Sequence, residues 1–162
     1  MTAFQTRTKD TRDDWQTPIE IVNALGDFDL DPCANTQDPT RCALSGLTIE
    51  DNGLEGIWGG RIWCNPPYGA ETRLWMRRMA RHGNGIALIP PRMGSVWFQQ
   101  EVLDTADAIL FMRGRVSFIN AATGSKVQGN NAESCLIAWG EQNVEALFAS
   151  GINGKIWNLT YD

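Results

Sequence analysis

The sequence predicts an α/β domain built on a mainly parallel β-sheet, with an antiparallel strand at one edge. Short apolar segments of strand length alternate with segments of helical periodicity, and this alternation is typical of parallel sheets. Near the C-terminus, residues 108–119 and 133–140 form two long apolar segments separated by a polar loop, which indicates the antiparallel strand. Because 162 residues suit one core, we expect a single domain over residues 1–162, with a flexible polar stretch at 1–13.

The first helix is expected in the segment TPIEIVNALG, residues 17–26. Thr17 is a suitable N-cap, and Pro18 suits the first helical position. Glu20 would complete a capping box with Thr17, and Gly26 can end the helix. The capping and terminating residues of this segment therefore predict a helix that begins directly after Thr17.

Two short strands are expected next, in FDLDPCA (28–34) and in RIWC (61–64), with a loop-rich stretch between them. The first ends at Asp31-Pro32, and the second runs into a turn that contains two prolines. In open parallel sheets, ligands bind beyond the carboxyl ends of the strands. The sequence therefore predicts a site that includes Asp31 and the residues after Cys64.

An amphipathic helix is expected in TRLWMRRMARHG, residues 72–83. Its apolar residues share one face: Trp75, Met76, Met79 and Ala80. Its arginines, spaced i, i+4 and i+8, share another face: Arg73, Arg77 and Arg81. The remaining elements are a buried strand in 85–92, helices in 95–106 and 141–151, and a last strand in 155–160.

The charge is distributed unevenly along the chain, although the net charge is only −5. Residues 1–60 hold four Lys/Arg and eleven Asp/Glu, whereas residues 61–126 hold nine Lys/Arg and four Asp/Glu. The middle segment therefore has a local charge of +5. This local charge suits a polyanionic partner, although the negative total charge suggests otherwise. The alternative interpretation is a chance cluster of solvated charges.

The cysteines do not predict a metal site. Cys33, Cys42, Cys64 and Cys135 form no C-x-x-C pair, and His82 is the single histidine, so no zinc site is expected. We expect the thiols to pack as small hydrophobic groups in a reducing compartment. No apolar run approaches the roughly 20 residues of a membrane span, and the polar N-terminus has no signal-peptide core, which predicts a soluble cytoplasmic protein.

The segment WCNPPYG contains the most informative residues of the chain, Asn65, Pro66, Pro67 and Tyr68. Each proline removes an N–H, so the backbone here offers carbonyl acceptors without competing donors. The Asn65 side-chain carbonyl adds a further acceptor, and Tyr68 adds an aromatic face. This combination suits a planar ring with an exocyclic amine, whose developing positive charge the acceptors would stabilise. The alternative is a rigid turn at the end of a strand.

Several motifs resemble the phage Dam-like family of DNA N6-adenine methyltransferases: DWQTP, FDLDPCA, GLEGIWGGRIWCNPPYG and LFMRGRVSF. The resemblance implies a Rossmann-like class I methyltransferase sheet that binds S-adenosylmethionine. It also implies that Asn65-Pro66-Pro67-Tyr68 holds an adenine flipped out of double-stranded DNA. The glycine-rich loop common in class I methyltransferases is missing after Ala34, and Asp31 and Asn65 are close in sequence, which implies an abbreviated cofactor half.

The resemblance also carries candidate site residues. It implies cofactor contacts from two segments and one acidic residue, namely Trp15, Thr17 and Pro18, then Asp31, Pro32, Cys33 and Ala34, and finally Asp51. Recognition of DNA would use loops at the carboxyl edge of the sheet, Gly69–Arg73 and Arg113–Asn131. The candidate phosphate contacts are Arg92, Arg113, Arg115 and Lys126, followed by Arg73 and Arg77, although the helical arginines also suit a solvated face.

The predicted function is S-adenosylmethionine-dependent methylation of adenine N6 in DNA, in the host-cell cytoplasm if the protein is encoded by a phage. Two other interpretations stay open at this point. The same tetrapeptide occurs in enzymes that methylate RNA bases or protein glutamine, and the abbreviated cofactor half would also fit a catalytically inactive DNA-binding protein.

Overall fold

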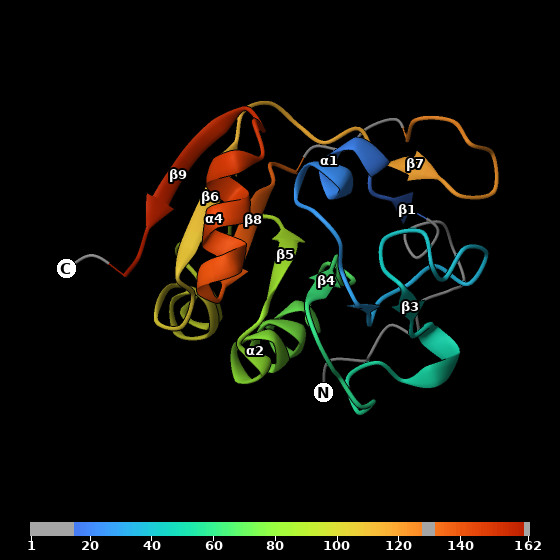
Figure 1. The fold of residues 1–162 in the computed structure, drawn as a ribbon, viewed down its shortest axis with the longest axis horizontal. Coiled ribbons are helices and arrows are strands. Elements are labelled where there is room, and N and C mark those ends of the chain that lie inside the picture. The colour runs from blue at the N-terminus through green and yellow to red at the C-terminus, as the bar shows by residue number, and fades with distance from the viewer. Residues whose placement is uncertain (1–14, 128–131, 161–162) are drawn as a thin grey trace.

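The computed structural model describes residues 15–127 and 132–160, so the stretch 1–13 and part of the loop before Glu133 lie outside the described residues. Within them, the main feature is a seven-stranded sheet in the order β3-β2-β4-β5-β8-β6-β9 (Figure 1). Its strands are β2 (Leu30–Asp31), β3 (Ser45–Gly46), β4 (Ile62–Cys64), β5 (Gly85–Ile89), β6 (Ala108–Met112), β8 (Cys135–Trp139) and β9 (Gly154–Asn158).

The sheet is mixed, and its parallel part lies at one end. Strands β3, β2, β4 and β5 are parallel to one another. Strand β8 is antiparallel to both β5 and β6, and β9 at the edge is antiparallel to β6. The segment 133–140, which predicted the antiparallel strand, forms β8 and is antiparallel, but it lies in the interior of the sheet and not at the edge, where β9 lies instead. Strand β8 begins at the end of the sheet where β6 stops. It therefore runs between β5 and β6 in the direction opposite to both.

Helices cover both faces of this sheet. They are α1 (Ile19–Ala24), α2 (Thr72–His82), α3 (Val96–Phe98) with the π-helical turn η2 (Gln99–Leu103), and α4 (Glu141–Ala149), and the loop after β3 adds a 3-10 turn, η1 (Ile49–Asp51). One face packs against α2, α3 and η2, and the other packs against α1 and α4. The result is a three-layer α/β arrangement.

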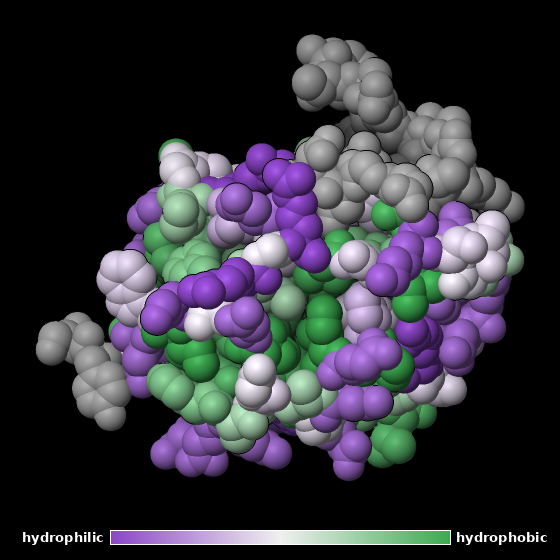
Figure 2. Space-filling view, turned by 90° about the horizontal axis from the view of Figure 1, so that it is seen from above, coloured by the Kyte–Doolittle hydropathy of each residue, from purple (hydrophilic) through white to green (hydrophobic). Residues whose placement is uncertain are grey.

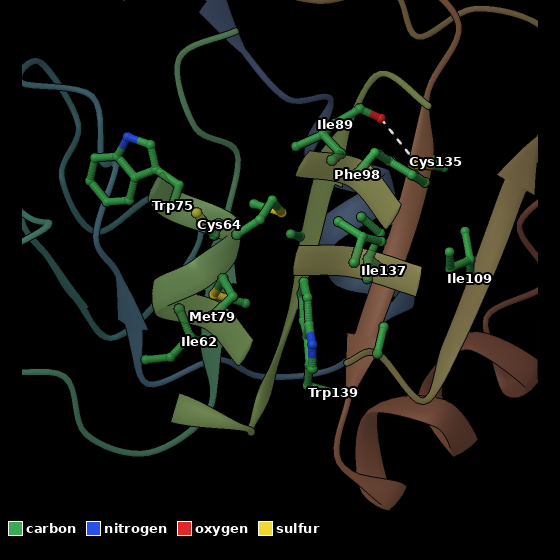
Figure 3. Packing of buried hydrophobic residues seen from close by; sticks show 14 of the residues in the cluster. Ile62, Cys64, Trp75, Met79, Ile89, Phe98, Ile109, Cys135, Ile137 and Trp139 are labelled. Atoms are coloured by element: carbon green, nitrogen blue, oxygen red, sulfur yellow. Dashed lines mark hydrogen bonds between the residues drawn. The ribbon is translucent and has the colours of Figure 1, made fainter. Parts of the chain in front are cut away.

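The amphipathic pattern of α2 is confirmed by its packing. Trp75, Met76 and Met79 are buried against the sheet, and Gly83 caps the helix with a φ of 73°. Figure 3 shows Trp75 and Met79 on this face with Phe98 from α3, beside the strand residues Ile62, Cys64, Ile89, Ile109, Cys135, Ile137 and Trp139. Burial of each large apolar side chain contributes about 1.5–3 kcal/mol, so this helix is fixed firmly beneath the loop that precedes it.

The long strand predicted over residues 108–119 is divided in two. Strand β6 ends at Met112, and Gly114 follows with a φ of 77°, in the left-handed region that favours glycine. The chain then leaves the sheet, buries Val116 and Phe118, and forms β7 (Ile119–Asn120). Strand β7 pairs with β1 (Trp15–Gln16) in a separate two-stranded sheet, which brings the segment before Thr17 to this end of the molecule (Figure 1).

The predicted N-cap of the first helix is wrong. Pro18, not Thr17, is the N-cap residue of α1, and no side chain caps the helix. The predicted capping box is therefore not formed. The physical reason is that the Thr17 hydroxyl faces inward, where its Oγ1 accepts a hydrogen bond from Asn65 Nδ2 at 3.1 Å. The end of the helix agrees with the prediction, since Gly26 follows it with a φ of 91°.

Candidate active site

The carboxyl ends of the parallel strands bring the predicted site residues to one edge of the sheet. Asp31 ends β2, Asn65 follows β4 and Pro90 follows β5. Strands β2 and β4 are neighbours, as are β4 and β5. We call this side of the molecule the carboxyl edge, and β5 points toward it, upward in Figure 1.

The proline turn after β4 is tied to the start of α2. Thr72 Oγ1 donates a hydrogen bond to the Pro67 carbonyl at 2.8 Å and accepts one from the Gly69 N–H at 3.0 Å. Gly69 has a φ of 134°, a conformation that glycine adopts readily and other residues rarely adopt. The turn is therefore held by two rigid prolines, one glycine and the buried Thr72 at the start of α2, which is the arrangement expected for a preorganised group of acceptors. The sequence had indicated the turn, but not this role of Thr72.

The Asn65 side chain lies between two hydroxyl groups. Its Nδ2 donates to Thr17 Oγ1 at 3.1 Å, and its Oδ1 accepts from the Tyr68 hydroxyl at 2.9 Å. A carbonyl oxygen has two lone pairs, so Oδ1 can accept a second hydrogen bond. The predicted acceptor is therefore fixed in place and retains capacity for one more donor.

Tyr68 is partly buried, and its ring packs against both hydrophobic clusters. The edge of the ring meets Phe118 at 6.3 Å between centroids, and Phe118 in turn stacks on Trp15 at 5.8 Å. Burial raises the pKa of the Tyr68 hydroxyl well above its usual value, so this group stays protonated and acts as a donor. The sequence predicted the aromatic ring at this position, but it did not predict that the hydroxyl would contact Asn65.

Asp31 is a buried carboxyl group, 6% exposed, at the end of β2. Burial raises its pKa from 3.8 to about 7, and the hydrogen bond from the Cys33 N–H to Oδ1, at 2.9 Å, acts in the opposite direction. The charged form of an isolated buried carboxyl group is costly unless a cation accompanies it. Asp31 is thus poised to take a positively charged ligand group.

The residues that directly follow Asp31 pack against the end of β4 and the loop after η1. Cys33 Sγ lies 3.9 Å from Cys64 Sγ, which joins the segment after β2 to the residue before Asn65. Pro32 and Ala34 are both buried. The loop after η1 packs on the same segment, because a Cβ on Gly53 would lie 2.0 Å from the Pro32 carbonyl oxygen. Only glycine fits at this point.

Asp51 lies in η1 and is exposed, and its Oδ2 accepts hydrogen bonds from the Thr48 N–H and Oγ1 at 2.8 and 3.1 Å. It therefore caps the turn that leads to Gly53. Trp15 and Pro18 flank Thr17 on the side of β1 and α1, and both are partly buried. The structure brings Thr17 and Asn65 together directly, whereas Trp15 stacks on Phe118, whose ring also meets Tyr68.

Most predicted DNA-contacting residues lie at or near the carboxyl edge. Arg92 follows β5, Arg113 and Arg115 follow β6, Lys126 bridges to Ile119 beside β7, and Arg73 lies in the first turn of α2; all five are exposed. Figure 2 views this side of the molecule and shows hydrophobic surface in the middle, bordered by strongly hydrophilic surface. The arrangement suits a ligand with a charged backbone and an apolar ring.

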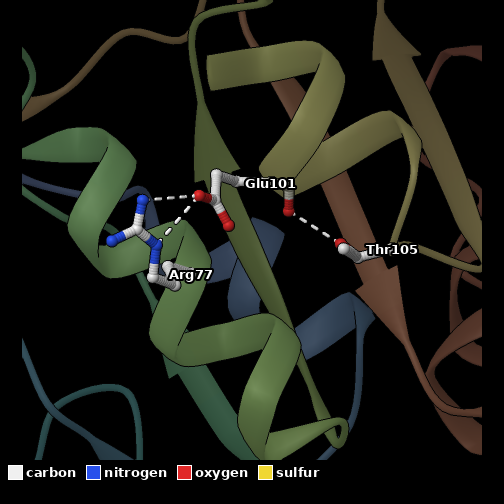
Figure 4. A network of polar contacts seen from close by, with 3 residues as sticks. All are labelled: Arg77, Glu101 and Thr105. Carbon is white, nitrogen blue, oxygen red and sulfur yellow. Dashed lines mark hydrogen bonds and ion pairs between the residues drawn. The ribbon is translucent and has the colours of Figure 1, made fainter. Parts of the chain in front are cut away.

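Arg77 differs from these five residues because its charge already has a partner. Its Nε and Nη2 lie 2.9 and 2.8 Å from Glu101 Oε1, and Thr105 Oγ1 donates to the Glu101 carbonyl at 2.7 Å (Figure 4). This ion pair joins α2 to η2. The geometry therefore gives Arg77 a structural partner and makes it the weakest member of the predicted set.

Within residues 15–127 and 132–160, no group of three or more His, Cys, Asp or Glu side chains is placed to hold a metal ion. No helix among them is long and apolar enough to cross a membrane.

Comparison with known proteins adds independent evidence. The family model described as DNA N-6-adenine-methyltransferase (Dam) matches residues 5–155. The chain is 28% identical over 156 residues to a protein of Escherichia phage T1 named DNA N-6-adenine-methyltransferase, covering 81% of this chain and 64% of that protein. It is 29% identical over 147 residues to a protein of Haemophilus phage HP1 (strain HP1c1) with the same name, covering 85% and 83%. No solved structure matches the chain significantly. Since the family model spans nearly all of the sequence, the chain belongs to the DNA N-6-adenine-methyltransferase (Dam) family.

Proposed function

We propose that this protein transfers a methyl group from S-adenosylmethionine to N6 of an adenine flipped out of double-stranded DNA. The observation that carries the proposal is the fixed Asn65 acceptor, which lies at the same edge of the sheet as the buried carboxyl group of Asp31. A base must leave the stack to reach such a pocket, because a paired adenine cannot present N6 to it. Membership of the Dam family supports the same reaction.

The acceptors of the turn would act on the amine. Asn65 Oδ1 would accept one N6–H, and a proline carbonyl of the turn would accept the second N–H; the Pro67 carbonyl already uses one of its two lone pairs to accept from Thr72. Two such hydrogen bonds favour a pyramidal nitrogen and stabilise the positive charge that develops on it. Tyr68 would support the flipped ring by stacking. No general base is required for this role.

Asp31 and its neighbours would hold the cofactor. S-adenosylmethionine supplies an electrophilic methyl group when bound, and its methionine part carries an ammonium group that a buried carboxylate can pair with. The raised pKa of Asp31 fits this assignment, because a cation would offset the cost of its burial. Pro32, Cys33 and Ala34 would form the wall next to β4, Trp15 and Pro18 would contribute from the segment on either side of Thr17, and Asp51 would approach the adenine moiety of the cofactor.

Arg92, Arg113, Arg115, Lys126 and Arg73 would bind DNA phosphates. These side chains are exposed along the edge at which the base would enter. Phosphate contacts position the duplex and make binding depend on salt, without specifying sequence. We leave Arg77 out of this set because of its ion pair with Glu101.

The direct test is methylation of unmodified duplex DNA by the full chain with methyl-labelled cofactor, followed by nucleoside analysis. We expect N6-methyladenine as the labelled product. Asn65→Ala should lower kcat by about 10²–10³-fold with a smaller change in DNA affinity. Asn23→Ala, at an exposed position of α1, is the matched control and should retain the rate of the unmodified protein.

Three results would contradict the proposal and identify its rivals. Label found in RNA or in protein glutamine, but not in DNA, would assign the site to another planar amine or amide. DNA binding without label, together with no cofactor binding in calorimetry, would indicate an inactive DNA-binding protein. Full activity of Asn65→Ala would show that the proline segment is only a turn.

A further inference from the structure

The contact between Thr17 and Asn65 joins two segments that are 48 residues apart in sequence. Thr17 is 3% exposed, so its hydroxyl is removed from water. The Thr17 Oγ1 accepts from Asn65 Nδ2 at 3.1 Å, while the Tyr68 hydroxyl donates to Asn65 Oδ1 at 2.9 Å. Both ends of the Asn65 amide are therefore held, each by a different hydroxyl group.

The orientation of this amide matters because its two ends have similar shapes and opposite chemistry. With Oδ1 toward the substrate amine, Asn65 accepts a hydrogen bond. With the amide turned by 180°, Nδ2 would present two donors to an amine that also donates. The turned state could not stabilise positive charge on the amine nitrogen, so only one of the two orientations is productive.

The hydroxyl of Tyr68 breaks the symmetry between the two orientations. It has one proton, and its two acceptors are Asn65 Oδ1 at 2.9 Å and the Leu88 carbonyl at 3.4 Å. The longer distance exceeds the 2.5–3.0 Å of a good O–H···O bond, so the proton is better placed on Asn65. Nδ2 must then turn to Thr17, whose oxygen is the acceptor that holds it.

We propose that Thr17 is a positioning residue for methyl transfer, which acts by holding Asn65 with its carbonyl oxygen toward the target amine. The proposal rests on the function proposed above and assigns Thr17 a role other than binding the cofactor. Thr17 acts through Asn65 and touches neither the amine nor the methyl group. It links the segment before α1 to the rate of the reaction.

The test compares two substitutions of similar size at this position. Thr17→Val keeps the shape and removes the hydroxyl, whereas Thr17→Ser keeps the hydroxyl. We expect Thr17→Val to lower the single-turnover rate by about 10- to 100-fold at saturating cofactor and DNA, and Thr17→Ser to stay within about threefold of the unmodified protein. The dissociation constant for S-adenosylmethionine, from calorimetry, should change by less than about threefold in both variants.

A double variant gives a readout that a purely structural role would not change. Tyr68→Phe alone removes one holder of the Asn65 amide, and Thr17→Val removes the other. In the double variant the amide loses both, so the rate should fall by more than the product of the two single effects. Thr17→Ala, which also lacks the hydroxyl, takes the place of Thr17→Val if the latter does not fold.

Several results would overturn the proposal. An unchanged rate in Thr17→Val, beside an inactive Asn65→Ala, would remove the positioning role and leave the proposed function intact. Weaker cofactor binding with a normal saturated rate would make Thr17 a cofactor ligand instead. Equal losses in Thr17→Val and Thr17→Ser would show that packing matters and the hydroxyl does not. An active Asn65→Ala would refute the proposed function itself.

Discussion

Cofactor binding should become tighter as the pH rises from 5.5 to 7.0, and Asp31 should be the cause. The free protein holds a proton on Asp31 up to a pKa of about 7, because burial disfavours the charged carboxylate. An ammonium ligand pairs with the ionised form only. Binding must therefore displace this proton, and the displacement becomes easier as the pH approaches 7.

The magnitude follows from the ionised fraction. With a pKa of about 7, roughly 3% of Asp31 is ionised at pH 5.5 and about half at pH 7.0, so the affinity should rise about 15-fold. The same shift predicts the opposite trend for the free protein. Its folded pKa lies above the unfolded 3.8, so the stability from this group is complete below pH 4 and decreases as pH rises through 7. The loss is on the order of 4 kcal/mol.

Calorimetric titration with S-adenosylmethionine at several pH values measures the binding effect. Repeating it in two buffers of different ionisation enthalpy should reveal release of about half a proton per cofactor at pH 7.0. Asp31→Asn should bind weakly and with little dependence on pH, whereas Asp38→Asn, at an exposed loop position, should behave like the unmodified protein. If Asp31→Asn shows the same pH profile as the unmodified protein, Asp31 does not carry the ligand's charge.

Two other predictions concern the base and the DNA backbone. Tyr68→Phe alone should lower the methylation rate only a few-fold, because stacking needs the ring, whereas Tyr68→Ala should lose about 1–3 kcal/mol of stacking and reduce 2-aminopurine fluorescence on flipping; equal effects would assign the role to the hydroxyl. Arg115→Ala should weaken DNA binding and lower the salt dependence by about one ion, while Arg77→Ala, whose charge pairs with Glu101, should leave that slope unchanged. Identical slopes for both variants in a salt titration would contradict the division between them.

The sequence was sufficient to predict most of the individual elements. The helix over residues 72–82 was recognised because its apolar side chains repeat at helical spacing and Gly83 ends it. The position of β8 between β5 and β6 was not recognised, because strand order depends on contacts between distant segments that no local pattern encodes. The break after Met112 had a local signal in Gly114, but the apolar residues on both sides of it favoured a continuous strand.

The location of the candidate site residues was easier to predict than their contacts. Asp31 and Asn65 follow neighbouring parallel strands, so sheet geometry alone places them at one edge. The hydrogen-bond partners of Asn65 were not predictable, because Thr17 also fits a helix cap in sequence. A threonine can cap a helix or bond a distant amide, and only the packed fold decides between the two.

The segments predicted to bind the cofactor also contact the residues next to the proline turn. Thr17 contacts Asn65, and Cys33 contacts Cys64, so both segments that were predicted to bind the cofactor touch the end of β4 that leads into the proline turn. A substitution in either segment can then change the methylation rate without any change in cofactor affinity. Measurements at subsaturating cofactor would combine the two effects into one apparent loss. Rates at saturation, set beside calorimetric affinities, are needed to separate a residue that binds the cofactor from one that orients Asn65.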